Sequence, residues 1–228
     1  MLGQIIYSAN GRGRLRLEEV NTYGLRVLRV QVDPDSCWAK HRLQKASRFF
    51  RRSGVRRVLV PDGFEGWAAL EKHGLHRVDP VSFLRAQAAP LTLAALRRRA
   101  QEPGRCAVAL RGIRVDRDVV NAAEELCLQV RDVCISVVRG GQELSDHLRW
   151  EYGAAVCPDH PAVAAAVRFD PRTGKQGAVV LDLFSPQPGL GGGGITLSGV
   201  NQTETELLPL LAALWEVGKV QKRDLEFT

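Results

Sequence analysis

The stretch Val55–Gly63 reads Val-Arg-Arg-Val-Leu-Val-Pro-Asp-Gly, a short apolar run that ends in a turn. Apolar runs of this length are typical of strands that are covered on both faces, as in a parallel sheet. The pattern returns at Val130–Ile135, which reads Val-Arg-Asp-Val-Cys-Ile. In each copy a helix-type segment follows and ends at a glycine, Gly74 in the first and Gly153 in the second. The sequence therefore predicts alternating strands and helices.

A longer helix and an earlier strand precede each copy. The segment 37–52 carries its apolar residues at steps of three and four, which predicts a helix with one buried face. The segment after Asp116 repeats this spacing, and Asp116 is a residue type that favours helix N-caps. The prediction is an α/β protein: a three-layer, Rossmann-like, mostly parallel sheet built from two related β-α-β-α-β halves.

The two ends of the chain depart from this pattern and predict antiparallel additions. Short β-type runs fill the first 33 residues, with turn signals at Asn10–Gly13 and Asn21–Gly24. After Pro158, the runs 163–169 and 178–184 flank a turn-rich segment, which predicts a second hairpin. The expected organisation is an N-terminal α/β half with a leading β-hairpin over 1–85, a helical connector over 86–104, and a C-terminal α/β half with an antiparallel hairpin and a final helix over 105–228.

Composition limits the class of protein. The chain has 228 residues, of which 45% are hydrophobic and 25% charged, as in ordinary globular proteins. No run approaches the roughly 20 apolar residues of a membrane helix, and Met1–Gln4 does not begin a basic region followed by an apolar core. We therefore expect a cytoplasmic protein without a membrane partner.

Positive charge is concentrated in the first half. Residues 1–117 hold 23 Lys and Arg against 10 Asp and Glu, whereas residues 118–228 hold 9 against 15. This asymmetry favours an anionic partner on the basic half, or attraction between the halves or between copies in a homo-oligomer. Of the 32 cations 26 are Arg, which suits bidentate contacts with phosphate or carboxylate. The alternative is that the arginine excess of this basic protein is a compositional bias.

Ligands of open parallel sheets gather beyond the carboxyl ends of the strands. A flexible glycine with an arginine ahead of a helix N-terminus makes an anion cradle there, although such loops also need glycine simply to turn. The candidate ligand-binding residues are those that follow the predicted strands: Asp62, Gly63, Arg111, Gly112, Arg114, Arg139, Gly140 and Gly141.

Known phosphate and nucleophile motifs are missing from the sequence. A dinucleotide site requires G-x-G-x-x-G after a strand, but Leu110–Asp116 contains one glycine. Gly191–Gly194 could surround a phosphate, yet it lacks a strand-to-helix setting and an adjacent cation, so it is interpreted as a flexible loop. The five histidines are scattered. Catalytic residues and a cofactor therefore remain unassigned.

Five cysteines are widely spaced, without a C-x-x-C pair or a Cys/His cluster in the sequence. Neither a disulfide framework nor a metal site is predicted. Buried, inert thiols are the expected state, and Cys157, at the end of a predicted strand, is the thiol with the best prospect of a role.

Three functions stay open. The first is a binding module for a small anionic metabolite or nucleotide, without an identifiable catalytic constellation. The second is an enzyme that acts on a phosphorylated or carboxylated metabolite in the same crevice. The third is a nucleic-acid-associated protein with a basic face made by Arg42, Lys45, Arg48, Arg52, Arg56, Arg57 and Arg97–Arg99.

Overall fold

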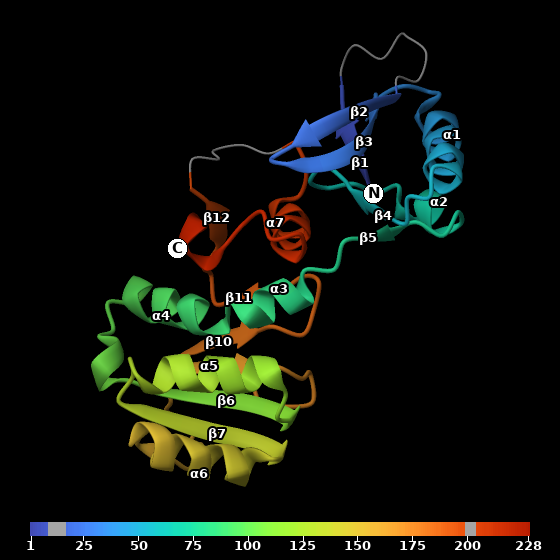
Figure 1. Cartoon of the computed structure of the whole chain (residues 1–228). Coiled ribbons are helices and arrows are strands. Elements are labelled where there is room, and N and C mark those ends of the chain that lie inside the picture. The colour runs from blue at the N-terminus through green and yellow to red at the C-terminus, as the bar shows by residue number, and fades with distance from the viewer. Residues whose placement is uncertain (9–16, 199–203) are drawn as a thin grey trace. The chain divides into compact units, whose positions relative to one another are not determined.

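A computed structural model describes residues 1–8, 17–198 and 204–228. The chain forms two compact units (Figure 1). The first comprises Met1–Pro80 and Gly199–Gln221, and the second comprises Val81–Ser198 and Lys222–Thr228. This division differs from the one expected from the sequence. The segment over 86–104 is part of the second unit, and the final helix belongs with the N-terminal unit.

The first unit is built on a five-stranded sheet in the order β2-β3-β1-β4-β5. Strand β2 is antiparallel to β3, and the other neighbours are parallel. Its elements are β1 (Leu2–Tyr7), β2 (Leu17–Thr22), β3 (Leu25–Val32), α1 (Ala39–Arg52), β4 (Arg57–Leu59), α2 (Trp67–Glu71), β5 (His76–Arg77) and α7 (Leu207–Glu216).

A tight hairpin connects β2 and β3, as the sequence predicts. Tyr23 and Gly24 form its two-residue loop, both with positive φ (51° and 86°), which is the geometry of a type I′ turn. The Asn21 side chain accepts a hydrogen bond from the Gly24 amide at 2.8 Å. The other predicted turn, over 10–13, lies outside the described residues. Strand β1 is not part of an antiparallel meander: it lies between β3 and β4 and is parallel to both.

Helices cover both faces of this first sheet. Phe50 of α1 packs against Gly3, where a β-carbon would lie 3.3 Å from its ring. On the other face, Leu210 of α7 lines a cavity together with Gln4 and Arg29 of the sheet. The unit is therefore a three-layer sandwich. Its core consists of Ile5, Val30, Val32, Leu43, Ala46, Phe50, Val55, Val58, Val60, Phe64, Leu70 and Leu75.

The second unit is built on a six-stranded sheet in the order β11-β10-β9-β6-β7-β8. Five neighbouring strands are parallel to one another, namely β8, β7, β6, β9 and β10. Strand β11 is antiparallel to β10 and forms an edge of the sheet. Its elements are α3 (Val81–Ala86), α4 (Ala88–Arg98), the 3-10 helix η1 (Pro103–Arg105), β6 (Ala107–Arg114), α5 (Arg117–Cys127), β7 (Asp132–Arg139), α6 (Gly141–Tyr152), β8 (Val156–Cys157), β9 (Ala165–Arg168), β10 (Val179–Asp182), β11 (Gly189–Leu190), β12 (Ile195–Leu197), the 3-10 helix η2 (Lys222–Asp224) and β13 (Leu225–Phe227).

The parallel strands of this second sheet, numbered along the chain, lie in the doubly wound order 3-2-1-4-5. This confirms the predicted α/β, Rossmann-like, mostly parallel fold. The two units share the predicted element order, β3-α1-β4-α2-β5 in one and β6-α5-β7-α6-β8 in the other. Their strand orders differ, because β1 separates β3 from β4, whereas β6, β7 and β8 are consecutive neighbours.

The hairpin predicted after Pro158 is wrong. Strands β9 and β10 are parallel, with Ala165 opposite Val179. The segment 169–178 therefore runs from the carboxyl end of β9 back to the amino end of β10. The antiparallel addition near the C-terminal end is β11 instead, together with the separate pair β12 and β13. Turn residues mark where a chain changes direction, but they do not fix whether the two flanking strands pair in parallel or antiparallel.

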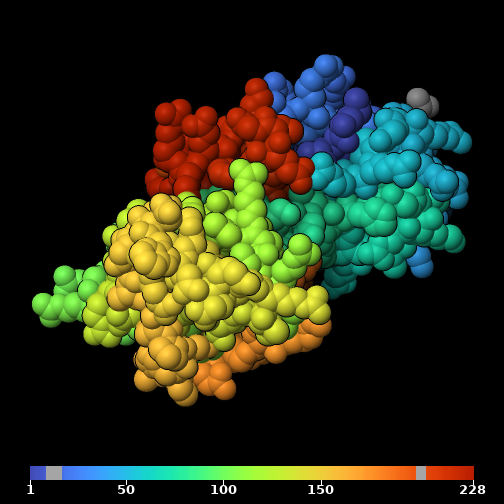
Figure 2. Space-filling view, turned by 60° about the horizontal axis from the view of Figure 1, so that its bottom comes forward, coloured from blue at the N-terminus to red at the C-terminus, as the bar shows by residue number. Residues whose placement is uncertain are grey.

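Helices α4, α5 and α6 pack side by side along one face of the second sheet. Figure 2 shows α5 and α6 as neighbouring yellow-green and gold surfaces. Asp116 caps α5 by accepting from the Val119 amide at 3.0 Å, and the left-handed Gly140 and Gly153 bound α6. On the opposite face, connecting segments replace helices: Gly177 approaches Ala166 so closely that a β-carbon would lie 3.2 Å away.

In the described residues, no helix has both the length and the apolarity needed to cross a bilayer.

Candidate functional site

The residues predicted to bind a ligand fall into both units. Asp62 and Gly63 follow β4 in the first unit, and the others belong to the second. Strand β6 continues to Arg114, so Arg111 and Gly112 lie inside the strand and not in a loop beyond it. The extended strand leaves two residues before α5, too few for a glycine-rich phosphate loop.

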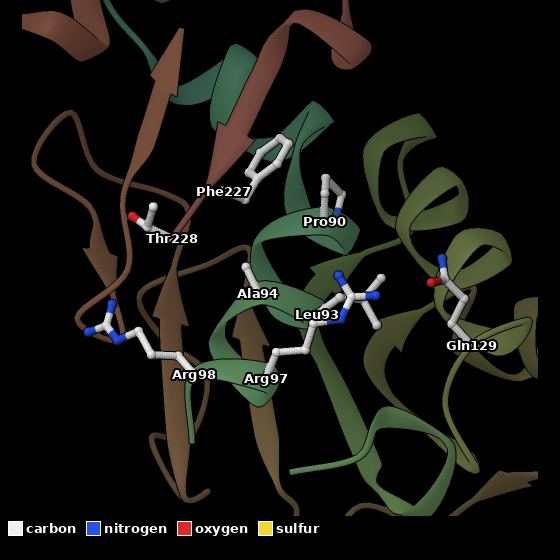
Figure 3. Close-up of a pocket in the computed structure, with 8 residues that line it drawn as sticks. All are labelled: Pro90, Leu93, Ala94, Arg97, Arg98, Gln129, Phe227 and Thr228. Carbon is white, nitrogen blue, oxygen red and sulfur yellow. The ribbon is translucent and has the colours of Figure 1, made fainter. Parts of the chain in front are cut away.

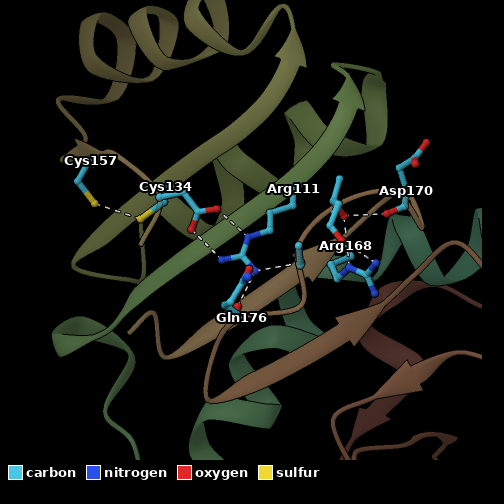
Figure 4. A network of polar contacts seen from close by, with 9 residues as sticks. Arg111, Cys134, Cys157, Arg168, Asp170 and Gln176 are labelled. Atoms are coloured by element: carbon cyan, nitrogen blue, oxygen red, sulfur yellow. Dashed lines mark hydrogen bonds and ion pairs between the residues drawn. The ribbon is translucent and has the colours of Figure 1, made fainter. Parts of the chain in front are cut away.

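Arg111 has a structural role in the second unit. Its side chain is 3% exposed, and its guanidinium binds both carboxylate oxygens of Asp159, Nε to Oδ2 at 2.7 Å and Nη2 to Oδ1 at 2.8 Å. Nη1 also donates to the carbonyls of Gly174 and Gln176 (Figure 4). All three guanidinium nitrogens therefore donate hydrogen bonds to the segments around Asp159 and Gly174–Gln176, which cover this face of the sheet.

Arg168 repeats this arrangement on the neighbouring strand. Its side chain is 1% exposed, pairs with Asp182 at 2.6 Å, and donates to the carbonyls of Pro171 and Thr173 at 2.8 Å. In Figure 4 both buried arginines point into the loops on this face. Two buried arginines hence hold down the loops that stand in place of a second helical layer.

Four predicted residues do come together at the carboxyl edge of β6 and β7. Arg114 and Arg139 are register partners, and both are exposed. Gly140 begins α6 with φ 81°, followed by Gly141. This group keeps the form of the predicted anion cradle, although none of the cavities described below includes it.

At the switch point between β6 and β9, where a doubly wound sheet changes direction, side chains of the chain itself contact the N-terminus of α5 and the neighbouring loops. The carboxylate of Asp116 stands at the N-terminus of α5, where a pyrophosphate would bind. Arg85 pairs with that carboxylate at 3.1 Å and donates to the carbonyls of Phe169 and Leu183. A carboxylate and its arginine partner therefore lie at the helix N-terminus where the pyrophosphate of a dinucleotide would bind.

A cavity of about 570 Å³ lies in the first unit beyond the carboxyl ends of β1 and β3. Gly63 lines it, with Tyr7, Lys40, Phe64 and Glu65 among its other residues. Burial, and then the charge of Glu65, raise the pKa of Tyr7. The lining is mostly apolar, and its one cation is matched by one carboxylate, so this cavity does not select for an anion.

A second cavity, of about 540 Å³, lies in the second unit and is called here the basic pocket (Figure 3). Arg97 and Arg98 in the last turn of α4 provide its charge, and Gln129 provides an amide. Its lining consists of Pro90, Leu93, Ala94, Arg97, Arg98, Gln129, Phe227 and Thr228.

The glycine-rich segment meets a cation at this pocket. A β-carbon on Gly192 would lie 2.5 Å from Nη2 of Arg98, and one on Gly193 would lie 2.7 Å from the Thr228 carbonyl oxygen. Hydrogen bonds between the backbones of Gly194 and Thr228, at 2.9 and 3.1 Å, fix the segment to the end of β13. Sequence reasoning set Gly191–Gly194 aside because no cation stands beside it, but the fold supplies one from 94 positions earlier.

The two arginines of the basic pocket have no ion-pair partner in the part of the chain that the structure describes. Both are exposed, and in Figure 3 they leave α4 in different directions, Arg98 toward the side of Thr228 and Arg97 away from it. Both also complement the negative end of the α4 dipole. Between them Leu93, Ala94 and Phe227 form an apolar floor. The pocket therefore offers two separated positive groups above an apolar surface.

Comparisons with known proteins give no family. No family model matches the chain, and no curated protein matches it in sequence. Among solved structures it is similar to an L-tryptophan dehydrogenase from Nostoc punctiforme, with 12% identity and a TM-score of 0.32 over 68% of this chain and 49% of that one. The chain thus spans about half the length of that dehydrogenase.

Two further solved structures show the same low level of similarity. A quinate dehydrogenase from Corynebacterium glutamicum matches at 12% identity and a TM-score of 0.27, over 75% of this chain and 70% of that one. An arylmalonate decarboxylase matches at 13% identity and a TM-score of 0.23, over 69% and 86%. Similarity at this level assigns neither an activity nor a ligand to this chain.

Proposed function

We propose that the chain is a ligand-binding α/β protein whose basic pocket holds a small organic anion with an apolar body. The observation that carries the proposal is the pair of guanidinium groups, Arg97 and Arg98, which border one cavity and form no ion pair with any described residue. An arginine in such a pocket is set to bind a carboxylate or phosphate with two parallel hydrogen bonds.

The rest of the lining sets the class of ligand. Phe227 and Leu93 offer an apolar surface for a flat or branched hydrocarbon group, and the Gln129 amide can donate to or accept from a further polar atom. The volume of about 540 Å³ falls in the range of small-molecule sites. Aromatic carboxylates and nucleoside monophosphates combine these features, whereas inorganic phosphate would leave the apolar floor unused.

The proposal is tested by calorimetry and thermal shift with panels of aromatic carboxylates, nucleoside monophosphates and inorganic phosphate. Arg97→Gln and Arg98→Gln should each weaken binding by about 10- to 100-fold, the usual loss for one charged hydrogen-bonding partner. Arg99→Gln is the matched control, because Arg99 is exposed at the same helix end but does not line the pocket. The Arg99→Gln variant should bind the same anions with the affinity of the wild type.

A second pair of variants separates the basic pocket from the carboxyl-edge cradle. Arg114→Gln and Arg139→Gln should leave affinity unchanged if the anion binds in the basic pocket. The proposal is rejected if these two variants abolish binding while Arg97→Gln and Arg98→Gln do not. It is also rejected if no anion of the panels shifts the melting temperature of the wild type.

Nucleic acid is the second candidate, favoured by α1. This helix exposes five cations and has no acidic residue in its first turn. Trp38, 63% exposed, lies beside His41 at its start, with ring centroids 6.3 Å apart. The exposed cations are Lys40, Lys45, Arg48, Arg51 and Arg52.

Salt titration of binding to random-sequence RNA and DNA tests this surface. Each phosphate contact contributes a slope of about −0.7 to −0.9 in log affinity against log salt concentration. Arg48→Gln together with Arg52→Gln should reduce the slope by about two contacts. A slope that stays the same in this double variant, or no retention at low salt, rejects the α1 surface.

A further inference from the structure

Two cysteines that are far apart in the sequence face each other in the second sheet. Cys134 of β7 and Cys157 of β8 are register partners on neighbouring parallel strands. Their sulfur atoms are 3.1 Å apart, as the dashed line in Figure 4 shows. Both are free thiols. The parallel register itself brings the two side chains to the same face, so the pairing is a direct product of the fold.

A histidine completes the group three residues beyond Cys157. One ligand atom each from Cys134, Cys157 and His160 lies within 4.8 Å of the other two. Cys134 is buried, Cys157 is half-buried and His160 is exposed. The three donors therefore extend from the apolar interior of the sheet to the surface.

Two thiolates and an imidazole are a soft donor set. Such donors select zinc and related thiophilic ions over calcium and magnesium, which require oxygen ligands. Tetrahedral zinc with Zn–S bonds of about 2.3 Å places two thiolates about 3.8 Å apart. The sulfur atoms, now 3.1 Å apart, need to separate by less than 1 Å, which is within reach of small rotations of the two side chains.

Among the residues that the structure describes, no fourth His, Cys, Asp or Glu belongs to this group. Asp159, next to His160 in sequence, has both carboxylate oxygens engaged by Arg111 at 2.7 and 2.8 Å. It is therefore a neighbour of the site and not a ligand. Three protein ligands with an open fourth position are the arrangement of zinc sites that keep a water molecule.

We propose that Cys134, Cys157 and His160 bind one Zn²⁺ ion, with water as the fourth ligand. Simple packing accounts for the position of Cys134, which belongs to an apolar cluster with Ala109 and Ala166. It does not account for the imidazole, since His160 is exposed and gains no apolar burial at this place. This site is independent of the basic pocket, with which it shares no residue.

The test uses the full chain, reduced with a phosphine and stripped with a chelator before titration with Zn²⁺ or Co²⁺. Competition with a chromophoric chelator gives the stoichiometry and affinity, and we expect one Zn²⁺ per chain. Bound Co²⁺ should show thiolate-to-metal charge transfer and the intense visible bands of tetrahedral coordination. Neither readout depends on an activity of the protein.

Variants assign the ligands. Cys157→Ser and His160→Ala should each weaken Zn²⁺ binding by at least about 100-fold, more than the usual loss from a residue that only supports a ligand. Cys127→Ser and His147→Ala are the matched controls, because neither residue belongs to the cluster. His160 is exposed, so its variant should fold even if Cys134→Ser does not, and circular dichroism checks this.

Three results would overturn the proposal. One is Zn²⁺ binding with equal affinity in the wild type, Cys157→Ser and His160→Ala. Another is a Co²⁺ complex without thiolate charge transfer. The third is a Cys134–Cys157 disulfide that forms in air and excludes the metal. In that case the reduced protein, when returned to buffer that contains Zn²⁺, would form the disulfide again and take up no metal.

Discussion

At the scale of single residues, the arginines of this chain divide into buried anchors and exposed groups. Arg111→Met should lower the free energy of unfolding by about 3 kcal/mol or more, because it leaves a carboxylate and two carbonyls without their partner. Arg172→Met is the control: its pair with Asp170 is at the surface, so the change should be small. Urea denaturation measures both. Equal effects would show that Arg111 is not an anchor.

The partner of Arg111 makes stability depend on pH. Burial alone would raise the pKa of Asp159, but the hydrogen bonds and charge of Arg111 outweigh it and leave the pKa below its ordinary value. A lowered pKa in the folded state stabilises the protein above the ordinary carboxyl pKa of about 3.9, and this stabilisation disappears as the pH falls below it.

The variant Asp159→Asn tests this dependence. Its deficit in stability relative to the wild type should be constant from neutral pH to about 5 and should shrink below about 4. Urea denaturation at a series of pH values measures the difference. A deficit that grows on acidification would mean that the pKa of Asp159 is raised and that Arg111 does not control it.

At the scale of elements, the hairpin of β2 and β3 depends on one glycine. Gly24 has φ 86°, a conformation that costs other residues about 1–2 kcal/mol. Gly24→Ala should therefore lower the free energy of unfolding by about 1–2 kcal/mol, measured by urea denaturation. Gly104→Ala is the control, since Gly104 has no positive φ and no neighbour within 4 Å of a β-carbon. A Gly24→Ala variant as stable as this control would contradict the type I′ geometry.

Local chemistry predicted the elements, whereas the pairing of strands lay beyond it. Asp116 as a cap and Gly153 as a stop are set by their own backbone neighbours, and both predictions are confirmed. The insertion of β1 between β3 and β4, and the parallel course of β9 and β10, depend on contacts between distant segments. A repeat in the order of elements does not determine the order of strands.

The candidate sites were missed for the same reason. Cys134 and Cys157 are 23 positions apart and meet only because β7 and β8 are in register. The one local signal was the spacing Cys157-x-x-His160, which offers two ligands from one segment. Arg98 and Gly192 are brought together by the fold in a similar way. The absence of a nearby cation in the sequence was therefore not sufficient ground to interpret Gly191–Gly194 only as a flexible loop.

At the scale of the whole molecule, chain order and unit membership differ. Helix α7 lies near the C-terminal end of the sequence, yet it belongs to the first unit. The backbone amide of Glu206 donates to the carbonyl of Val60 at 2.8 Å, and Glu216 pairs with Arg57 at 2.6 Å. An apolar helix of this kind can cover any open sheet face, so its sequence alone does not reveal which sheet it covers.

Hydrogen exchange can verify this assignment. Leu211 of α7 is fully buried, and Leu211→Ala should cost about 2–5 kcal/mol, chiefly in the first unit. Amide exchange should therefore accelerate in β1 and β3 and change little in β6 and β7. Leu126→Ala is the matched substitution in the second unit, because Leu126 of α5 is equally buried, and it should give the reverse pattern. Acceleration of β6 and β7 by Leu211→Ala, to the same degree as β1 and β3, would show that α7 does not stabilise the first unit selectively.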